Sequence, residues 1–314
     1  MVLDHSSIKC IFFKCEFLST QKSRENALRI KGLSEAYKQG GVDGLMKKLN
    51  DDMDAWRKVP IRVAVIGSCG SGKSSFINAM RGITDPNQKG YASVDNIEQT
   101  MVITEYPHPA NDNLVLCDLP VVGTRKFPKE KYLEEVKVDT YDFFIIISDT
   151  RFTENDAWLA TEVSKRNKSF YFVRTKVDRD VYNTNKLYKT SVDETVGKIR
   201  AYTQTRIKEL NLLLPSTVFL VNNYNTREYD FGKLTKKISE DLPILRRDAF
   251  VLSLSTITSN VLEEKKRVLQ TRIFLVAAGL AIAAVAPIPG AGLAANLAII
   301  KCEIAFYRKQ LGTE

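Results

Sequence analysis

The feature that most constrains this chain is a glycine-rich octapeptide, Gly67-Ser68-Cys69-Gly70-Ser71-Gly72-Lys73-Ser74. It follows an apolar run at 61–66 and precedes a helix-forming run at 75–80. A strand, a Gly-x-x-x-x-Gly-Lys-Ser turn and a helix in this order are typical of a phosphate-binding loop. The glycines let backbone N–H groups turn toward phosphates, and the N-terminus of the following helix adds partial positive charge. The predicted phosphate-binding residues are Gly67, Gly70, Ser71, Gly72, Lys73, Ser74 and Ser75.

Further apolar runs follow the octapeptide, separated by helical or loop segments. Near-continuous hydrophobic strands that alternate with helices indicate a mostly parallel sheet with helices on both faces, which is an α/β fold. Such sheets bind ligands beyond the carboxyl ends of their strands, where the octapeptide lies. The predicted strands are 61–66, 114–117, 143–148, 170–175 and 218–221.

Candidate magnesium ligands surround the predicted phosphate site. Ser74 offers a hydroxyl, and Asp118 ends an apolar strand, where nucleotide-hydrolysing proteins with such loops hold Mg²⁺ directly or through water. A Thr between the two should close over the metal, and Thr100 is the first candidate, with Thr104 second. The candidate catalytic residues are Lys73, Thr100 and Gly123.

The residues after Asp118 depart from the usual pattern of a GTP-hydrolysing switch. The third position on, often Gly, is Val121, whose β-branched side chain restricts backbone movement. Gly123 is the candidate that supplies this freedom instead. No Gln stands just after Asp118-Leu119-Pro120 to orient water, so we expect slow hydrolysis by an isolated monomer.

Thr175-Lys176-Val177-Asp178 follows the strand at 170–174 and indicates the base. A carboxylate there accepts from the ring N–H and the exocyclic amine of guanine, which adenine does not match. Asn222-Asn223, after the last strand, is the candidate contact to the guanine carbonyl, although Asn in a loop is otherwise a turn former. The predicted ligands are guanine nucleotides, GTP or GDP, with Mg²⁺.

Helical segments flank this region on both sides. Residues 23–58 read as two helices broken at Gly40-Gly41, and no strand is apparent after 243. Residues 273–300 carry no charge and reach transmembrane length, but Pro287 to Gly292 would break a membrane span. Two Ala-rich helices joined by a Pro-Gly turn fit better, and membrane contact without spanning stays open. The predicted domains are a loose leader at 1–22, N-terminal helices at 23–58, a nucleotide-binding domain at 59–243 and a C-terminal helical segment at 244–314.

The charge of the chain limits the classes of partner it can have, and its cysteine content indicates the compartment. The 46 basic residues exceed the 37 acidic ones by nine, but they are dispersed in mixed-sign stretches and form no arm of nucleic-acid type. We therefore expect no nucleic-acid partner, while the net charge permits contact with an anionic membrane. Five cysteines without a Cys-x-x-Cys pair indicate a reducing, cytoplasmic compartment.

The motifs together closely resemble the immunity-related GTPases, the interferon-inducible GTPases of vertebrate cell-autonomous defence. The resemblance implies a Ras-like GTPase domain, a helical domain built from both chain ends, and GTP-dependent self-association or association with related GTPases on intracellular, pathogen-containing membranes. The segments that carry it are 70–78, 118–120, 141–148, 170–178, 219–223 and 240–243.

Three features qualify the resemblance. Val121 replaces the family's usual Gly, which bears on switching and on the hydrolysis rate. Lys73 places the chain with the Lys-bearing, effector-like branch, since another branch carries Met there. The chain ends soon after 306–308, where relatives continue through further helices that include a membrane-contacting one, so membrane targeting is less secure.

Overall fold

A computed structural model describes residues 21–94, 102–209, 217–255, 258–284 and 291–313. The chain divides into two compact units: residues 57–262, and a helical unit of residues 1–56 with 263–314. Each unit is described by itself.

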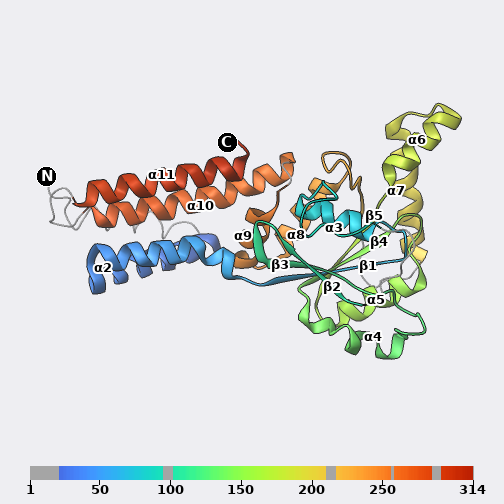
Figure 1. The fold of residues 1–314 in the computed structure, drawn as a ribbon, viewed down its shortest axis with the longest axis horizontal. Helices are drawn as coiled ribbons and strands as arrows, with labels where there is room; N and C mark the ends of the chain where they lie inside the picture. The colour runs from blue at the N-terminus through green and yellow to red at the C-terminus, as the bar shows by residue number, and fades with distance from the viewer. Residues whose placement is uncertain (1–20, 95–101, 210–216, 256–257, 285–290, 314) are drawn as a thin grey trace. The chain divides into compact units, whose positions relative to one another are not determined.

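The larger unit is built on a six-stranded sheet of the described residues, in the order β2-β3-β1-β4-β5-β6 (Figure 1). All neighbouring pairs are parallel except β2 and β3. The predicted α/β architecture is therefore confirmed. The strands are β1 Ile61–Gly67, β2 Thr104–His108, β3 Asn111–Asp118, β4 Phe143–Ser148, β5 Ser169–Arg174 and β6 Val218–Leu220.

The sequence reading missed the antiparallel edge strand β2. Its five residues include Pro107, and only His108 is buried. An edge strand tolerates proline because one of its sides needs no partner, and it lacks the apolar run that marks a buried strand. The register places Thr104 opposite Asp118, so β2 begins at the edge of the sheet where β3 ends.

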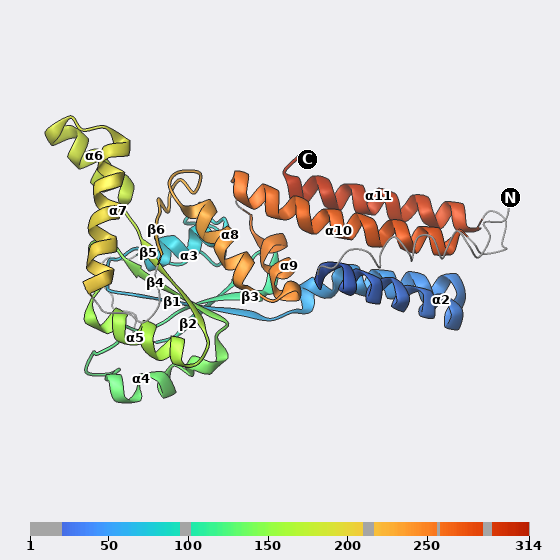
Figure 2. The ribbon, with the colours of Figure 1, turned by 180° about the vertical axis from the view of Figure 1, so that it is seen from behind.

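Helices cover both faces of the sheet (Figure 2). On one face, Phe76 packs 5.9 Å from Phe231 and Phe250 packs 6.0 Å from Phe143, as ring-centroid distances. The opposite face buries Phe144 and Phe172 against other helices. The helices on the first face are α3 Lys73–Arg81, α8 Phe231–Asp241 and α9 Ile244–Ser253. The helices that contribute side chains to the core on the opposite face are α4 Lys129–Glu135, α5 Glu154–Lys165, α6 Val177–Tyr188 and α7 Val192–Glu209.

The helical unit contains α2 Gln21–Asp54, α11 Ala291–Leu311 and most of α10 Ser259–Ala283. Helix α2 is kinked at Gly41, which has φ 59° and ψ −146°, and this confirms the predicted break. The unit has its own core, formed by Ile30, Leu33, Leu45, Leu49, Met53, Leu275, Val276 and Ala283. Figure 1 shows α10 and α11 running side by side.

The apolar segment 273–300 falls on two separate helices, as the hairpin interpretation predicts. Its Pro-Gly turn lies largely outside the described residues. Within the described part of the chain, no helix is both long and apolar enough to cross a bilayer. Residues 244–262 group with the sheet, whereas the sequence predicted them in the C-terminal helical segment. The reason is that Phe250 of α9 packs against Phe143 of β4.

Candidate nucleotide-binding site

The phosphate-binding loop connects the carboxyl end of β1 to the first turn of α3. Gly70 and Gly72 have φ values of 73° and 90°, a left-handed conformation that glycine adopts without steric cost. The N–H of Ser71 donates to the carbonyl of Ser68 at 3.2 Å and tightens the turn. The loop therefore has the shape that turns its N–H groups toward an anion at a helix N-terminus.

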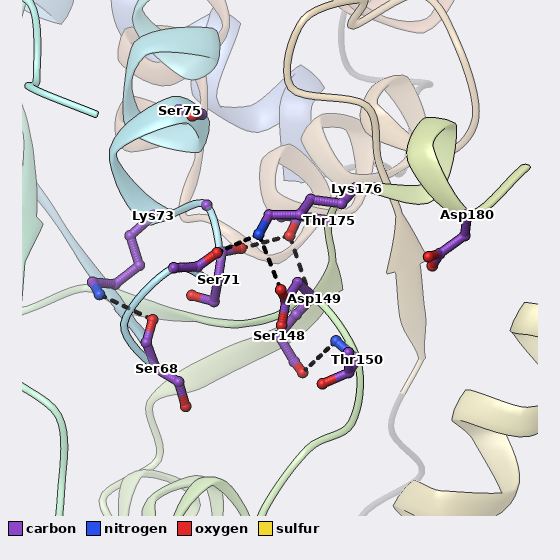
Figure 3. A network of polar contacts seen from close by, with 12 residues as sticks. Ser68, Ser71, Lys73, Ser75, Ser148, Asp149, Thr150, Thr175, Lys176 and Asp180 are labelled. Carbon is purple, nitrogen blue, oxygen red and sulfur yellow. Dashed lines mark hydrogen bonds and ion pairs between the residues drawn. The ribbon is translucent and has the colours of Figure 1, made fainter. Parts of the chain in front are cut away.

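Lys73 lies across the mouth of this loop. Its ammonium donates to the carbonyls of Gly67 at 3.0 Å and Ser68 at 3.3 Å, and the side chain is 7% exposed (Figure 3). These partners are neutral carbonyls, which leave the positive charge available to phosphate oxygens. The geometry suits the predicted role of Lys73.

Two glycines allow the loop to pack against neighbouring strands. A Cβ on Gly67 would lie 2.4 Å from the carbonyl oxygen of Ile147, at the end of β4. A Cβ on Gly72 would lie 3.3 Å from both Thr175 Oγ1 and Asn223 Nδ2, which follow β5 and β6. The loop is thus enclosed by segments from three other strand ends.

The segment after β5 holds the phosphate loop directly (Figure 3). Thr175 is fully buried, and its hydroxyl donates to the carbonyl of Ser71 at 2.6 Å. The ammonium of Lys176 donates to the carbonyl of Gly70 at 2.5 Å and pairs with Asp149 at 3.0 Å. Thr175 and Lys176 therefore hold the phosphate loop in addition to any contact with the base.

Asp178 lies in the first turn of α6 and is half-buried. That turn is tied to the end of β5 by an ion pair between Arg174 Nη2 and Asp180 Oδ2 at 2.6 Å. The Arg174 side chain is 8% exposed, and its Nε and Nη1 are buried without a hydrogen-bond partner. The helix start that carries Asp178 is therefore anchored from within the protein.

The structure separates the roles of the two asparagines after β6. The amide of Asn222 is used within its own loop: its oxygen accepts from the N–H groups of Tyr224 and Asn225, and its nitrogen donates to Glu228. Asn223 instead donates to the carbonyl of Gly72 at 3.1 Å, and its amide oxygen is buried without a partner. Asn223 thus adjoins the phosphate loop, and Asn222 shapes the loop that presents it.

The predicted metal ligands lie on two elements that meet at the carboxyl edge of the sheet. Asp118 is 5% exposed at the end of β3, and Ser74 is half-buried in the first turn of α3. One carboxylate and one hydroxyl fit Mg²⁺, which takes one or two protein oxygens and completes its shell with phosphates and water. Thr100 lies outside the described residues, while Thr104 is exposed at the start of β2.

The segment after Asp118 is held by a buried tyrosine. The hydroxyl of Tyr132 donates to the carbonyl of Pro120 at 2.7 Å. Burial raises the pKa of Tyr132 well above its usual value, so the phenol stays a neutral donor.

Gly123 has φ 81°, and its N–H donates to the carbonyl of Phe127 at 2.9 Å. Its proposed part in switching stays a prediction.

A comparison with family models identifies the chain. The model described as interferon-inducible GTPase (IIGP) matches residues 27–314. The chain belongs to the interferon-inducible GTPase family. The resemblance inferred from its motifs is therefore confirmed.

Curated relatives agree with the family assignment. The chain is 40% identical over 267 residues to T-cell-specific guanine nucleotide triphosphate-binding protein 2 of Mus musculus, covering 84% of this chain and 62% of that protein. It is 37% identical over 279 residues to interferon-inducible GTPase 1 of Mus musculus, covering 88% and 67%. The chain thus spans about three fifths of the length of the first of these relatives.

Among solved structures, the GDP complex of a GTP-binding protein from Sulfolobus solfataricus shows a partial likeness. It has a TM-score of 0.34 and 16% identity, over 71% of this chain and 67% of that one. The fold of this interferon-inducible GTPase family member is therefore established by its own sheet order and by its family.

Three supporting residues escaped the sequence reading: Asp149, Arg174 and Tyr132. Asp149 and Tyr132 lie outside the motif segments, with Asp149 directly after β4, whereas Arg174 lies within 170–178 and directly precedes Thr175 but was given no role. Position after a strand was the available signal for Asp149, but it does not name a partner. The contact of Asp149 with Lys176 depends on the pairing of β4 with β5, and the contact of Tyr132 with Pro120 depends on the packing of α4 against the segment after β3.

Proposed function

We propose that this interferon-inducible GTPase family member binds guanine nucleotides and hydrolyses GTP to GDP with Mg²⁺. The observation that carries the proposal is the joining of the phosphate loop to the segments after β5 and β6. Thr175, Lys176 and Asn223 all donate to carbonyls of residues 70–72. Because the predicted base-binding segments are hydrogen-bonded to the backbone of the phosphate loop, we infer that the two make up a single nucleotide site.

Each residue then has a physical role. The N–H groups of the loop and the Lys73 ammonium bind the phosphates and offset charge that develops during transfer. Asp178 accepts from the guanine edge, while the stem of Lys176 packs along the base. Ser74 and Asp118 would hold Mg²⁺, which neutralises phosphate charge when it is bound. Asn223 completes the base side of the site, and Asn222 holds the loop that presents it.

The base assignment is tested with Asp178→Asn. An amide in place of the carboxylate donates where the carboxylate accepted, so preference should move from guanine toward xanthine nucleotides. The measurement is titration of GDP and xanthosine diphosphate by calorimetry. Asp193→Asn, an exposed carboxylate in the first turn of α7, is the matched control and should leave both affinities unchanged. If the ratio of the affinities for GDP and xanthosine diphosphate is the same in Asp178→Asn as in the native chain, Asp178 does not read the base.

We further propose that hydrolysis is activated by self-association, or by association with related GTPases. No Gln stands just after Asp118-Leu119-Pro120 to orient water, and a neighbouring molecule would supply the missing group. The specific rate of phosphate release should rise with protein concentration and vanish in Lys73→Ala. A flat specific rate from dilute to concentrated protein contradicts this activation.

Val121 supports a second candidate function, a hydrolysis-impaired module that binds guanine nucleotide and regulates partner GTPases or membranes. Its β-branched side chain stands where the family usually has Gly, and it limits movement of the segment after Asp118. Multiple turnover above the Lys73→Ala background eliminates this candidate. Nucleotide binding without turnover at any concentration eliminates the first one.

Family membership supports a role in cell-autonomous immunity, with the protein in the cytoplasm and in peripheral contact with intracellular, pathogen-containing membranes. The net charge of +9 suits an anionic membrane surface. Flotation with anionic vesicles should recover the GTP-loaded protein more than the GDP-loaded one. If neither the GTP-loaded nor the GDP-loaded protein floats with the vesicles, membrane contact is refuted.

A further inference from the structure

The loop that follows β6 places an aromatic side chain, Tyr224, beside the nucleotide site. Asn222 fixes its backbone, since the amide oxygen accepts from the N–H of Tyr224 at 2.9 Å. The other end of the loop is closed by Glu228, which accepts from both Asn222 and Asn225 at 2.9 Å. The position of Tyr224 is therefore set by a closed hydrogen-bond network within the loop.

The side chain of Tyr224 extends from this loop to the phosphate-binding helix. Its hydroxyl lies 3.5 Å from the hydroxyl of Ser75, a buried residue in the first turn of α3. The preceding residue, Asn223, donates to the carbonyl of Gly72. Two consecutive residues thus reach the start of α3, and the phenol ring spans the space between the β6 loop and that helix.

A nucleoside bound in the proposed site would extend across this same space. Its phosphates belong at residues 67–74, and the residue that reads its base, Asp178, begins α6 after β5. The strands β5 and β6 are neighbours, so the loops that follow them flank the base together. Tyr224 is 80% exposed, which leaves most of its ring surface unpacked within this unit.

We propose that the ring of Tyr224 packs on the face of the bound purine nucleoside. This inference rests on the proposed function, because it assigns a residue to the same site. Asp178 reads the edge of the base, where guanine differs from other purines, whereas a ring on its face contributes affinity without distinguishing exocyclic groups. Tyr224 therefore determines how tightly a purine is held, and Asp178 determines which purine.

The division between face and edge predicts a specific pattern of affinities. Tyr224→Ala should weaken binding of GDP and of inosine diphosphate by the same factor, about fivefold or more, the loss expected when an aromatic side chain leaves a stacked base. Binding of inorganic pyrophosphate should not change, because it lacks a base. Tyr224→Phe should stay within about twofold of the native affinity, since a hydroxyl contact of 3.5 Å is weak.

The experiment is calorimetric titration of the full chain with GDP, inosine diphosphate and pyrophosphate. Tyr188→Ala is the matched control, because Tyr188 is 73% exposed on α6 and lies outside the proposed contact. In Tyr224→Trp, addition of GDP should change indole fluorescence. Unchanged GDP affinity in Tyr224→Ala, or an equal loss for pyrophosphate, would overturn the inference while leaving the proposed function intact. Failure of the native chain to bind GDP would overturn both.

Discussion

A buried ion pair in the helical unit offers the sharpest quantitative prediction. Arg272 on α10 forms two hydrogen bonds of 2.6 Å with the carboxylate of Glu303 on α11. A third bond of 2.6 Å goes to the carbonyl of Met53 in α2, and the guanidinium carbon lies 4.2 Å from the centre of the Phe306 ring. The two charged side chains are 11% and 12% exposed. Arg272 therefore connects all three long helices of the unit.

The expected cost follows from what remains after one partner is removed. Glu303→Leu leaves a buried guanidinium that keeps neutral partners, among them the Met53 carbonyl and the Phe306 ring. It should therefore destabilise the unit by about 3 kcal/mol, the lower part of the range for a broken buried pair. The double variant Arg272→Met/Glu303→Leu buries no uncompensated charge. It should return to within about 1 kcal/mol of the parent, because apolar replacements of buried pairs are commonly neutral.

Fluorescence can report on this unit alone. The chain has two tryptophans, and Trp56 is 5% exposed in the helical unit, with its ring 6.4 Å from that of Phe306. In a Trp158→Phe background, urea unfolding followed by Trp56 emission gives the free energy of unfolding of the helical unit. A loss below about 1 kcal/mol in Glu303→Leu, or a double variant as unstable as the single one, would refute the reasoning.

Three further predictions follow. Burial lowers the pKa of Lys265 to about 8, so above that pH the unfolded chain binds more protons than the folded one. The stability of the helical unit should therefore rise from pH 8 to 9.5, and it should rise more in the native protein than in Lys265→Met, as measured by urea midpoints. Arg174→Met frees Asp180 and the first turn of α6, and should weaken GDP binding about tenfold in calorimetry while pyrophosphate binding holds; equal losses would place the defect in the phosphate loop. Gly67→Ala should unfold or distort the phosphate site, since its Cβ would meet the Ile147 carbonyl at 2.4 Å, and a native-like melting temperature with intact GDP binding would contradict this.

Much of the sheet was predictable because its central strands are buried on both faces. Runs such as Phe143 to Ser148 are fully buried in the structure, and continuous apolar sequence is the direct consequence. The edge strand β2 gave no such signal, since it is mostly exposed and contains Pro107. The pattern of burial, rather than strand propensity, decided which strands the sequence revealed.

The candidate site was predictable to a different extent. Its individual motifs are contiguous, and each motif carries its own chemistry: glycines that adopt left-handed backbone, an ammonium, a carboxylate after a strand. Asn222 and Asn223 show the limit of this reasoning, because two adjacent identical residues cannot be assigned separate roles from composition. Their contacts with Glu228 and Gly72 separate them.

The sequence by itself predicted a phosphate loop and a guanine-reading segment, because local backbone conformation and side-chain chemistry suffice to recognise each. Only the tertiary structure decided that they lie against each other. The hydroxyl of Thr175 meets the carbonyl of Ser71 across 104 positions, and Asn223 meets Gly72 across 151. Such contacts depend on the parallel order of β1, β4, β5 and β6, which brings the carboxyl ends of distant strands to the same edge of the sheet.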